Sequence, residues 1–222
     1  MDDPSVSPER MADGLRFIEW ANRWLGGTRA FLSHVERFSA RWERGRPITF
    51  LDVGTGAADL PRALAAWGRE RGHDVRVVAL DLSAPVLAYA HQACRGNDRV
   101  ALLRGNALAL PFADRSVDYV CSSMFFHHLS DEQIVAVLRC YDRVARRGIL
   151  VNDLLRRVRA YLWIRLIAPF SGSDLVRHDG PVSVLRGFRV GEADALAQKA
   201  GLPWLRAQVH FGHRFVLGGE RP

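Results

Sequence analysis

The sequence predicts an α/β protein with a doubly wound, mostly parallel sheet. From Ile48 onward, short apolar runs alternate with stretches of helical periodicity, and a glycine-rich turn follows the first run. This alternation is typical of βαβ units, in which each strand is followed by a helix that returns over the sheet. The 222 residues, 48% of them hydrophobic, are ample for one domain with a sizeable core. We therefore expect a Rossmann-like fold.

The central part of the chain, residues 47–153, is expected to form the sheet. Its apolar runs predict strands at 48–53, 75–81, 100–104, 117–122 and 147–153. The intervening helices are expected at about 58–71, 84–95 and 131–143.

Residues 1–46 predict a helical cap made of two helices. Ser7 followed by Pro8 is a helix start, and Gly26-Gly27 ends the apolar stripe that follows it. A second apolar stripe, Phe31 to Trp42, has helical spacing and ends before a glycine and a proline.

Residues 154–190 are expected to form an insertion after the fifth strand. The stretch from Arg156 to Phe170 is apolar and aromatic, and 171–189 is polar and glycine-containing, which predicts a loop. Residues 191–222 then predict a helix, Glu192 to Ala200, and two short strands at 205–209 and 215–217. All four parts belong to one predicted domain, 1–222.

Composition excludes several classes of protein. No apolar run reaches the length of a membrane span, and the acidic start does not resemble a signal peptide, so we expect a cytoplasmic protein without membrane insertion. Cys94, Cys121 and Cys140 lie far apart, which indicates neither a disulfide framework nor a zinc site. The net charge is +7, but the basic residues are dispersed, so we expect no nucleic-acid partner. The oligomeric state stays open.

The strongest motif is the strand Ile48–Val53 followed by Gly54-Thr55-Gly56. Glycines at this turn let a ligand approach the backbone at the carboxyl end of the sheet. A dinucleotide fingerprint would have glycine where this chain has Asp59, and that carboxylate would repel a pyrophosphate at the helix N-terminus. The motif therefore disfavours NAD and suits a cationic ligand such as a sulfonium amino acid.

Two further signals follow in order along the chain. Asp81 ends the second strand, where a carboxylate can accept hydrogen bonds from two ribose hydroxyls. Asn106 comes just after the third strand, where an amide can both donate to and accept from an adenine ring. Either residue alone is equally well explained as a cap or a turn residue, and only their joint placement points to a nucleoside.

Taken together, these motifs resemble the class I S-adenosylmethionine-dependent methyltransferases, over residues 48–153. The resemblance implies S-adenosylmethionine as cofactor. It departs from the family at Ala58, where many members have a third glycine, and at Asn106, where many have Asp. The cofactor-binding residues it implies are Asp52, Gly54, Thr55, Gly56, Asp59, Asp81, Leu82, Asn106, Ala107 and Ser122.

Two later segments resemble one group within this superfamily. Residues 110–120, and Phe126-His127-His128-Leu129 after the fourth strand, look like the ubiquinone/menaquinone-type and polyketide-tailoring enzymes of secondary metabolism. His127 and His128 are then candidate general bases, with His128 favoured, although a histidine here can equally cap a helix or fill the core. Asn152-Asp153 is too weak a pair to indicate a metal, so none is expected.

The expected reaction is methyl transfer to a small-molecule acceptor that is aromatic or quinone-like, most readily on oxygen. The aromatic residues of the cap and the insertion favour such an acceptor, and the candidate contacts are Trp24, Tyr161 and His178. Carbon methylation of a polyketide or quinone ring is the alternative. A third hypothesis is a catalytically silent interaction protein. The glycine turn and the positions of Asp81 and Asn106 argue against it.

Overall fold

A computed structural model describes residues 7–172 and 174–222. Within them, seven strands form one sheet in the order β3-β2-β1-β4-β5-β7-β6. The strands are β1 Ile48–Val53, β2 Val75–Asp81, β3 Val100–Arg104, β4 Val117–Ser123, β5 Ala145–Leu154, β6 Arg206–His210 and β7 Arg214–Glu220. The first five are parallel, and β7 pairs antiparallel with both β5 and β6. This confirms the predicted fold class.

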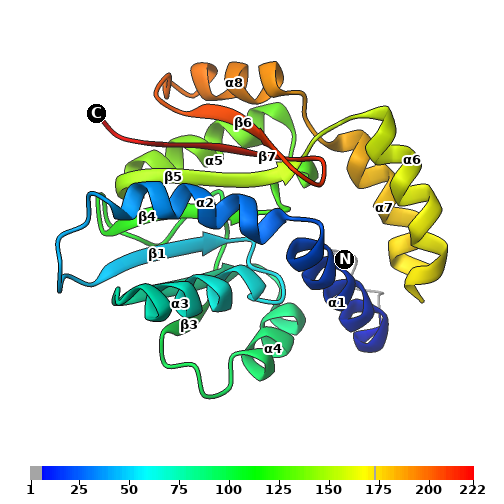
Figure 1. Cartoon of the computed structure of the whole chain (residues 1–222), viewed down its shortest axis with the longest axis horizontal. Helices are drawn as coiled ribbons and strands as arrows, with labels where there is room; N and C mark the ends of the chain where they lie inside the picture. Colours follow the sequence, from blue (N-terminus) through cyan, green and yellow to red (C-terminus); the bar gives the residue numbers. More distant parts are fainter. Residues whose placement is uncertain (1–6, 173) are drawn as a thin grey trace.

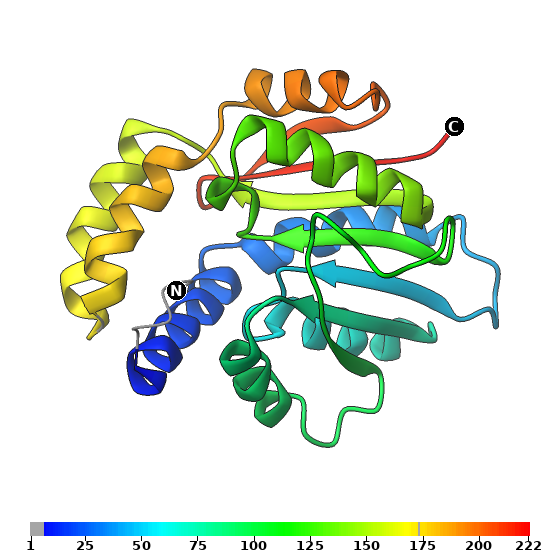
Figure 2. The same ribbon diagram turned by 180° about the vertical axis from the view of Figure 1, so that it is seen from behind.

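Helices cover both faces of the sheet, as Figures 1 and 2 show from opposite sides. The α-helices are α1 Pro8–Trp24, α2 Gly27–Ser39, α3 Asp59–Arg71, α4 Ala84–Ala93, α5 Asp131–Val144, α6 Val158–Ile167, α7 Asp174–Arg186 and α8 Val190–Lys199, with 3-10 turns η1 Phe126–His128 and η2 Ala168–Ser171. Because the inner strands are covered on both sides, they are buried at nearly every position rather than at alternate ones.

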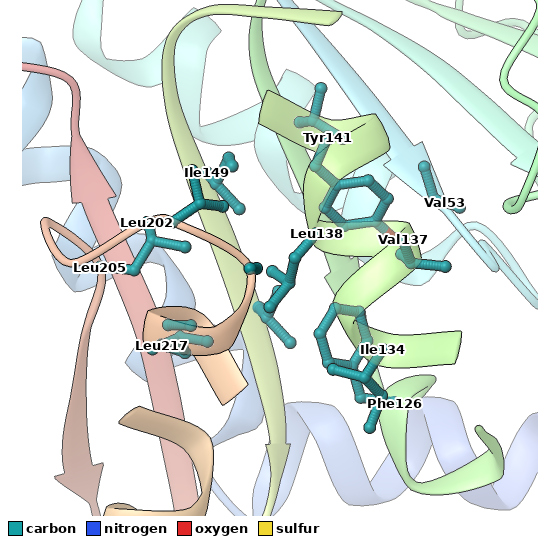
Figure 3. Packing of buried hydrophobic residues seen from close by; sticks show 14 of the residues in the cluster. Val53, Phe126, Ile134, Val137, Leu138, Tyr141, Ile149, Leu202, Leu205 and Leu217 are labelled. Carbon is teal, nitrogen blue, oxygen red and sulfur yellow. The ribbon is translucent and has the colours of Figure 1, made fainter. Parts of the chain in front are cut away.

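The core consists of two main clusters, one on each side of the sheet. On one side, α5 and the segment after α8 pack Ile134, Leu138 and Leu205 against β4, β5 and β7 (Figure 3). On the other side, an aromatic cluster joins α2 and α3 to β1 and β4, and the Trp42 indole donates a hydrogen bond of 2.8 Å to the Tyr119 hydroxyl. These clusters hold the carboxyl ends of the strands in fixed positions.

The two N-terminal helices do not act as one cap. α2 packs on the sheet through Phe31, Val35 and Phe38, because these residues form an apolar stripe along one side of the helix. It is therefore one of the helices that cover the sheet. α1 alone lies beyond the carboxyl ends of the strands (Figure 1). It is tied to α3 by the Arg62–Glu19 ion pair of 2.7 Å.

The segment predicted as a loop at 171–189 is mostly helical, which corrects the sequence prediction. The polar and glycine residues of this segment predicted a loop, yet α7 forms and even contains Pro181. A Cβ atom at Gly180 would lie 3.0 Å from the Ile164 side chain, so the glycine allows α6 and α7 to approach closely. Packing between the two helices therefore outweighs the helix-breaking residues. The pair projects beyond the carboxyl edge on the same side as α1 (Figure 1).

The outer surface of α6 carries several exposed apolar side chains, including Leu162, Leu166 and, just after the helix, Phe170. No helix within residues 7–172 and 174–222 is both long enough and apolar enough to cross a membrane.

The turn after β1 depends on glycine for two separate reasons. Gly54 has φ of +71°, and a Cβ atom there would lie 2.7 Å from the Phe125 ring. Gly72, at the end of α3, has a similar φ of +74° but open space around it. Substitution at Gly72 therefore tests backbone strain alone, whereas substitution at Gly54 tests backbone strain together with a steric clash.

We expect Gly54→Ala to lower the free energy of unfolding by about 2–4 kcal/mol, because left-handed backbone costs about 1–2 kcal/mol and overpacking adds to it. Gly72→Ala should cost only about 1–2 kcal/mol, the backbone contribution alone. Urea unfolding of both variants measures the difference. Equal losses would contradict the packing of Phe125 against this turn.

Candidate active site

A cavity of about 450 Å³ lies at the carboxyl ends of β1, β2 and β4, and we call it the glycine-loop cavity. Eight of the ten residues predicted to bind a cofactor line it, although they come from three separate loops. They are Gly54, Thr55, Gly56, Asp59, Asp81, Leu82, Asn106 and Ala107. The other two, Asp52 and Ser122, lie outside its lining.

Asp52 and Ser122 are buried beneath this cavity. Asp52 accepts a hydrogen bond of 2.6 Å from the Thr55 hydroxyl, so it shapes the turn from below. Burial raises the pKa of Asp52 to about 7. Ser122 is fully buried, and the alternation of side chains along β4 places its neighbour Ser123 at the cavity instead.

Asp81 connects the glycine turn to the end of β2. One carboxylate oxygen accepts a hydrogen bond of 3.0 Å from the Gly56 N–H, and the other accepts one of 3.0 Å from the Ser83 N–H. Asn106 uses its side-chain oxygen to accept from the Leu108 N–H at 2.9 Å, so recognition of a base by Asn106 falls mainly to its amide N–H groups.

At the α1 side of the cavity, the Asn22 amide donates a hydrogen bond of 2.9 Å to the Asp59 carboxylate. Burial raises the pKa of Asp59. The Asn22 side-chain oxygen is buried and has no hydrogen-bond partner among the described residues. The sequence offered no signal for Asn22, which lies within the apolar stripe of a helix.

A second cavity of about 160 Å³, the apolar cavity, lies between α1, α6 and α7. Its walls are mainly Phe17, Ile18, Trp163, Ile164 and Ile167. Met124 and His128 line both this cavity and the glycine-loop cavity, so the two adjoin at the end of β4.

The three predicted acceptor contacts lie outside both of these cavities. On α6, residues 160, 163, 164 and 167 face inward at helical spacing, which turns Tyr161 toward the Arg165 guanidinium, 5.9 Å from its ring. Trp24 is 65% exposed and lies under Arg23. His178 is exposed on the outer side of α7.

His127 lines the apolar cavity and forms a buried pair with Asp153. Its Nδ1 lies 2.7 Å from a carboxylate oxygen of Asp153. Burial alone would raise the pKa of Asp153, but His127 and further hydrogen bonds outweigh it and hold the pKa below its ordinary value. An ionised Asp153 only accepts, so Nδ1 of His127 must donate, which leaves Nε2 as the acceptor.

His128 is exposed, and its ring centroid lies 4.2 Å from that of His127. A third cavity of about 560 Å³, with Arg156, Arg186 and Glu192 in its lining, is also lined by both histidines. The two histidines therefore lie between an apolar compartment and a polar one. His127 has a buried carboxylate partner in Asp153, which makes it a candidate base beside His128, the histidine that the sequence favoured.

Several known proteins are similar to this chain. A family model described as a methyltransferase domain matches residues 50–148. A demethylmenaquinone methyltransferase of Thermus thermophilus is 35% identical over 194 residues, covering 79% of this chain and 84% of that protein. The chain belongs to the class I S-adenosylmethionine-dependent methyltransferases. A Bacillus licheniformis relative with the same name is 34% identical over 100 residues, covering 45% of this chain and 41% of that protein.

The first curated relatives are matched over about half of their length or less. Among solved structures, an S-adenosylmethionine-dependent methyltransferase of Aquifex aeolicus has a TM-score of 0.64 at 20% identity, covering 97% of this chain and 99% of that one. The CurJ carbon methyltransferase has a TM-score of 0.64 at 12% identity, covering 87% and 53%. Membership of this enzyme family disfavours the silent interaction protein.

The family's cofactor, S-adenosylmethionine, fits the residues present. The unpartnered oxygen of Asn22 and the buried carboxylate of Asp59 lie together, and they suit an ammonium group. The Cβ-free turn at Gly54 and Gly56 leaves room beside Asp81 for a nucleoside. We predict that Asp81 accepts the ribose hydroxyls.

Asp81→Asn should weaken binding of S-adenosylhomocysteine about 10- to 100-fold, since hydrogen bonds to a charged group contribute about 1.5–3 kcal/mol. Isothermal calorimetry measures the change. Asp98→Asn, which removes a 91% exposed carboxylate, is the matched control and should bind normally. Normal affinity in a folded Asp81→Asn variant would contradict the assignment.

The raised pKa of Asp52 predicts a stability that depends on pH. Between about pH 4 and pH 7 this carboxyl is ionised in the unfolded chain and protonated in the folded protein, so its contribution to stability falls as pH rises. Asp52→Asn cannot ionise. We expect its free energy of unfolding to rise by about 1–4 kcal/mol relative to wild type between pH 4 and pH 8, since one pKa unit corresponds to about 1.4 kcal/mol. A difference in urea unfolding that is independent of pH would contradict this.

Proposed function

We propose that the protein transfers a methyl group from S-adenosylmethionine to a hydroxyl oxygen of a small aromatic or quinol-like acceptor. His127 is the general base, and Asp153 is its positioning residue. The buried His127–Asp153 pair carries this proposal, because His127 lines the apolar cavity next to Met124 and His128, which line both that cavity and the cofactor-sized one.

A phenolic hydroxyl is a weak nucleophile until its proton is removed. Nε2 of His127 accepts that proton while the ionised Asp153 stabilises the resulting imidazolium through Nδ1. S-adenosylmethionine supplies a methyl group already activated by its sulfonium sulfur. The chain's remaining contribution is to hold the acceptor in line and to exclude water.

The walls of the apolar cavity suit a flat apolar acceptor. Trp163, Ile164 and Ile167 offer hydrophobic contact, while Met124 forms part of the boundary with the glycine-loop cavity. The polar cavity behind His127 gives the proton a route away from the apolar compartment. The proposed proton transfer does not require a metal. The described residues contain no cluster of three or more side chains that could hold one.

Carbon methylation is a second candidate, favoured by the names of the curated relatives, which are demethylmenaquinone methyltransferases. A deprotonated phenol or enol is also nucleophilic at the adjacent ring carbon, so the same base serves both reactions. Incubation with S-adenosylmethionine carrying a deuterated methyl group and a panel of phenols, naphthols and quinols identifies the acceptor by mass spectrometry. NMR of the product then distinguishes an O-methyl from a C-methyl group.

His127→Ala should lower turnover of the acceptor found in this panel by about 100-fold or more, the usual range for loss of a general base. Binding of S-adenosylhomocysteine should be unchanged. His128→Ala is the control, and we expect it to stay within a few-fold of wild type. If His128→Ala abolishes turnover and His127→Ala does not, the base has been assigned to the wrong histidine.

A further inference from the structure

Arg214, the first residue of β7, is a buried cation in the wall of the apolar cavity. It is only 2% exposed, although arginine is rarely buried to this extent without a partner. Burial lowers the pKa of Arg214 to about 10, with Asp153 and Asp59 opposing the shift. The guanidinium is therefore charged at neutral pH.

The nearby carboxylates do not neutralise Arg214 by direct contact. One oxygen of Asp153 accepts from His127 Nδ1 and the Leu154 N–H, and the other accepts from the Phe126 and His127 N–H groups. Asp59 accepts from Asn22. Within the described residues, no ion pair of Arg214 is found.

The groups that do contact Arg214 leave its hydrogen-bonding capacity largely unused. Its Nη1 contacts the Met124 thioether, which is a weak acceptor. Its Nε is buried and has no hydrogen-bond partner in the described chain. A buried, unpartnered donor on a charged group is costly, so a ligand that completes its hydrogen bonds would be strongly favoured.

The backbone around Arg214 also shows strain at this cavity. Met124 and His213 both have φ of +57°, although neither is glycine, and both line the apolar cavity. Strained residues of this kind gather where a binding site needs a particular geometry. Arg214 is absent from the lining of the glycine-loop cavity, which places it on the acceptor side.

We propose that the acceptor is an organic anion and that Arg214 binds its negatively charged oxygen. The acceptor class is then a hydroxylated aromatic acid or an acidic enol, with an apolar body against α6 and an oxyanion at β7. A guanidinium suits this role because its planar donors match a carboxylate or a delocalised enolate. This inference rests on the proposed function, since it assumes that the apolar cavity holds the acceptor.

The test is isothermal calorimetry of intact protein saturated with S-adenosylhomocysteine. One pair of probes is 3-hydroxy-2-naphthoate and its methyl ester, which tests a carboxylate. The other is 4-hydroxycoumarin and 4-methoxycoumarin, which tests an enolate. Wild type should bind the anion of at least one pair about 10- to 100-fold more tightly than its neutral partner, as expected for hydrogen bonds to a charged group.

Arg214→Met should remove this preference while leaving affinity for the neutral probe and for S-adenosylhomocysteine within about threefold, and Arg214→Lys should keep part of it. Binding of the neutral probe and of S-adenosylhomocysteine shows that each variant is folded. Arg206→Met, on the exposed neighbouring strand, removes the same charge elsewhere and should leave the preference intact.

Wild type that binds no anion, or binds anion and neutral probe equally, overturns the proposal. It is also overturned if Arg214→Met weakens S-adenosylhomocysteine binding and leaves the anion preference unchanged, because Arg214 would then serve the cofactor. A preserved anion preference without methyl transfer to any phenol, naphthol or quinol would count against the proposed reaction and not against this binding role.

Discussion

The buried carboxylate of Asp153 is the point on which the geometry of the site depends. Four hydrogen bonds from Phe126, His127 and Leu154 converge on it at the end of β5, and they join η1 to the sheet. Burying a charge is costly, and these donors, together with the nearby charge of Arg214, offset that cost. The same contacts set the direction and the protonated nitrogen of His127. The position of His127, the proposed base, is therefore a consequence of how β4 and β5 end.

The arrangement of cavities follows from the topology of the sheet. Parallel strands bring the glycine turn, Asp81 and the turn after β3 to one edge, while the antiparallel β7 brings Arg214 to the neighbouring position beside β5. α1 on one side and the α6–α7 pair on the other complete the apolar wall (Figure 1). Because the methyl donor is already activated, the protein needs to supply little covalent chemistry. On our proposals, the chain contributes a base, an apolar compartment for the acceptor and a cation that binds it.

The sheet and the glycine-loop cavity were predictable because their signals are local. A buried strand, a glycine turn and a terminal carboxylate recur in order, and each is read from a few neighbouring residues. The acceptor side was not predictable in this way. The rotation of α6 about its axis places Trp163, and not Tyr161, in the lining of the apolar cavity. Packing between helices keeps Gly180 and Pro181 inside α7. Asn22, Asp153 and Arg214 acquire their roles only through neighbours distant in sequence, so their residue types alone carried no signal.

On our proposal, Asp153 keeps His127 in the tautomer that has its proton on Nδ1. Nε2 can then accept a proton from the acceptor. Long-range ¹H–¹⁵N NMR of protein labelled with ¹⁵N-histidine, above the pH at which the ring is protonated, reads this state directly. We expect a neutral His127 ring in the Nδ1–H form, and we expect Asp153→Asn to shift it toward the other tautomer. An Nε2–H ring in the wild-type protein would contradict it.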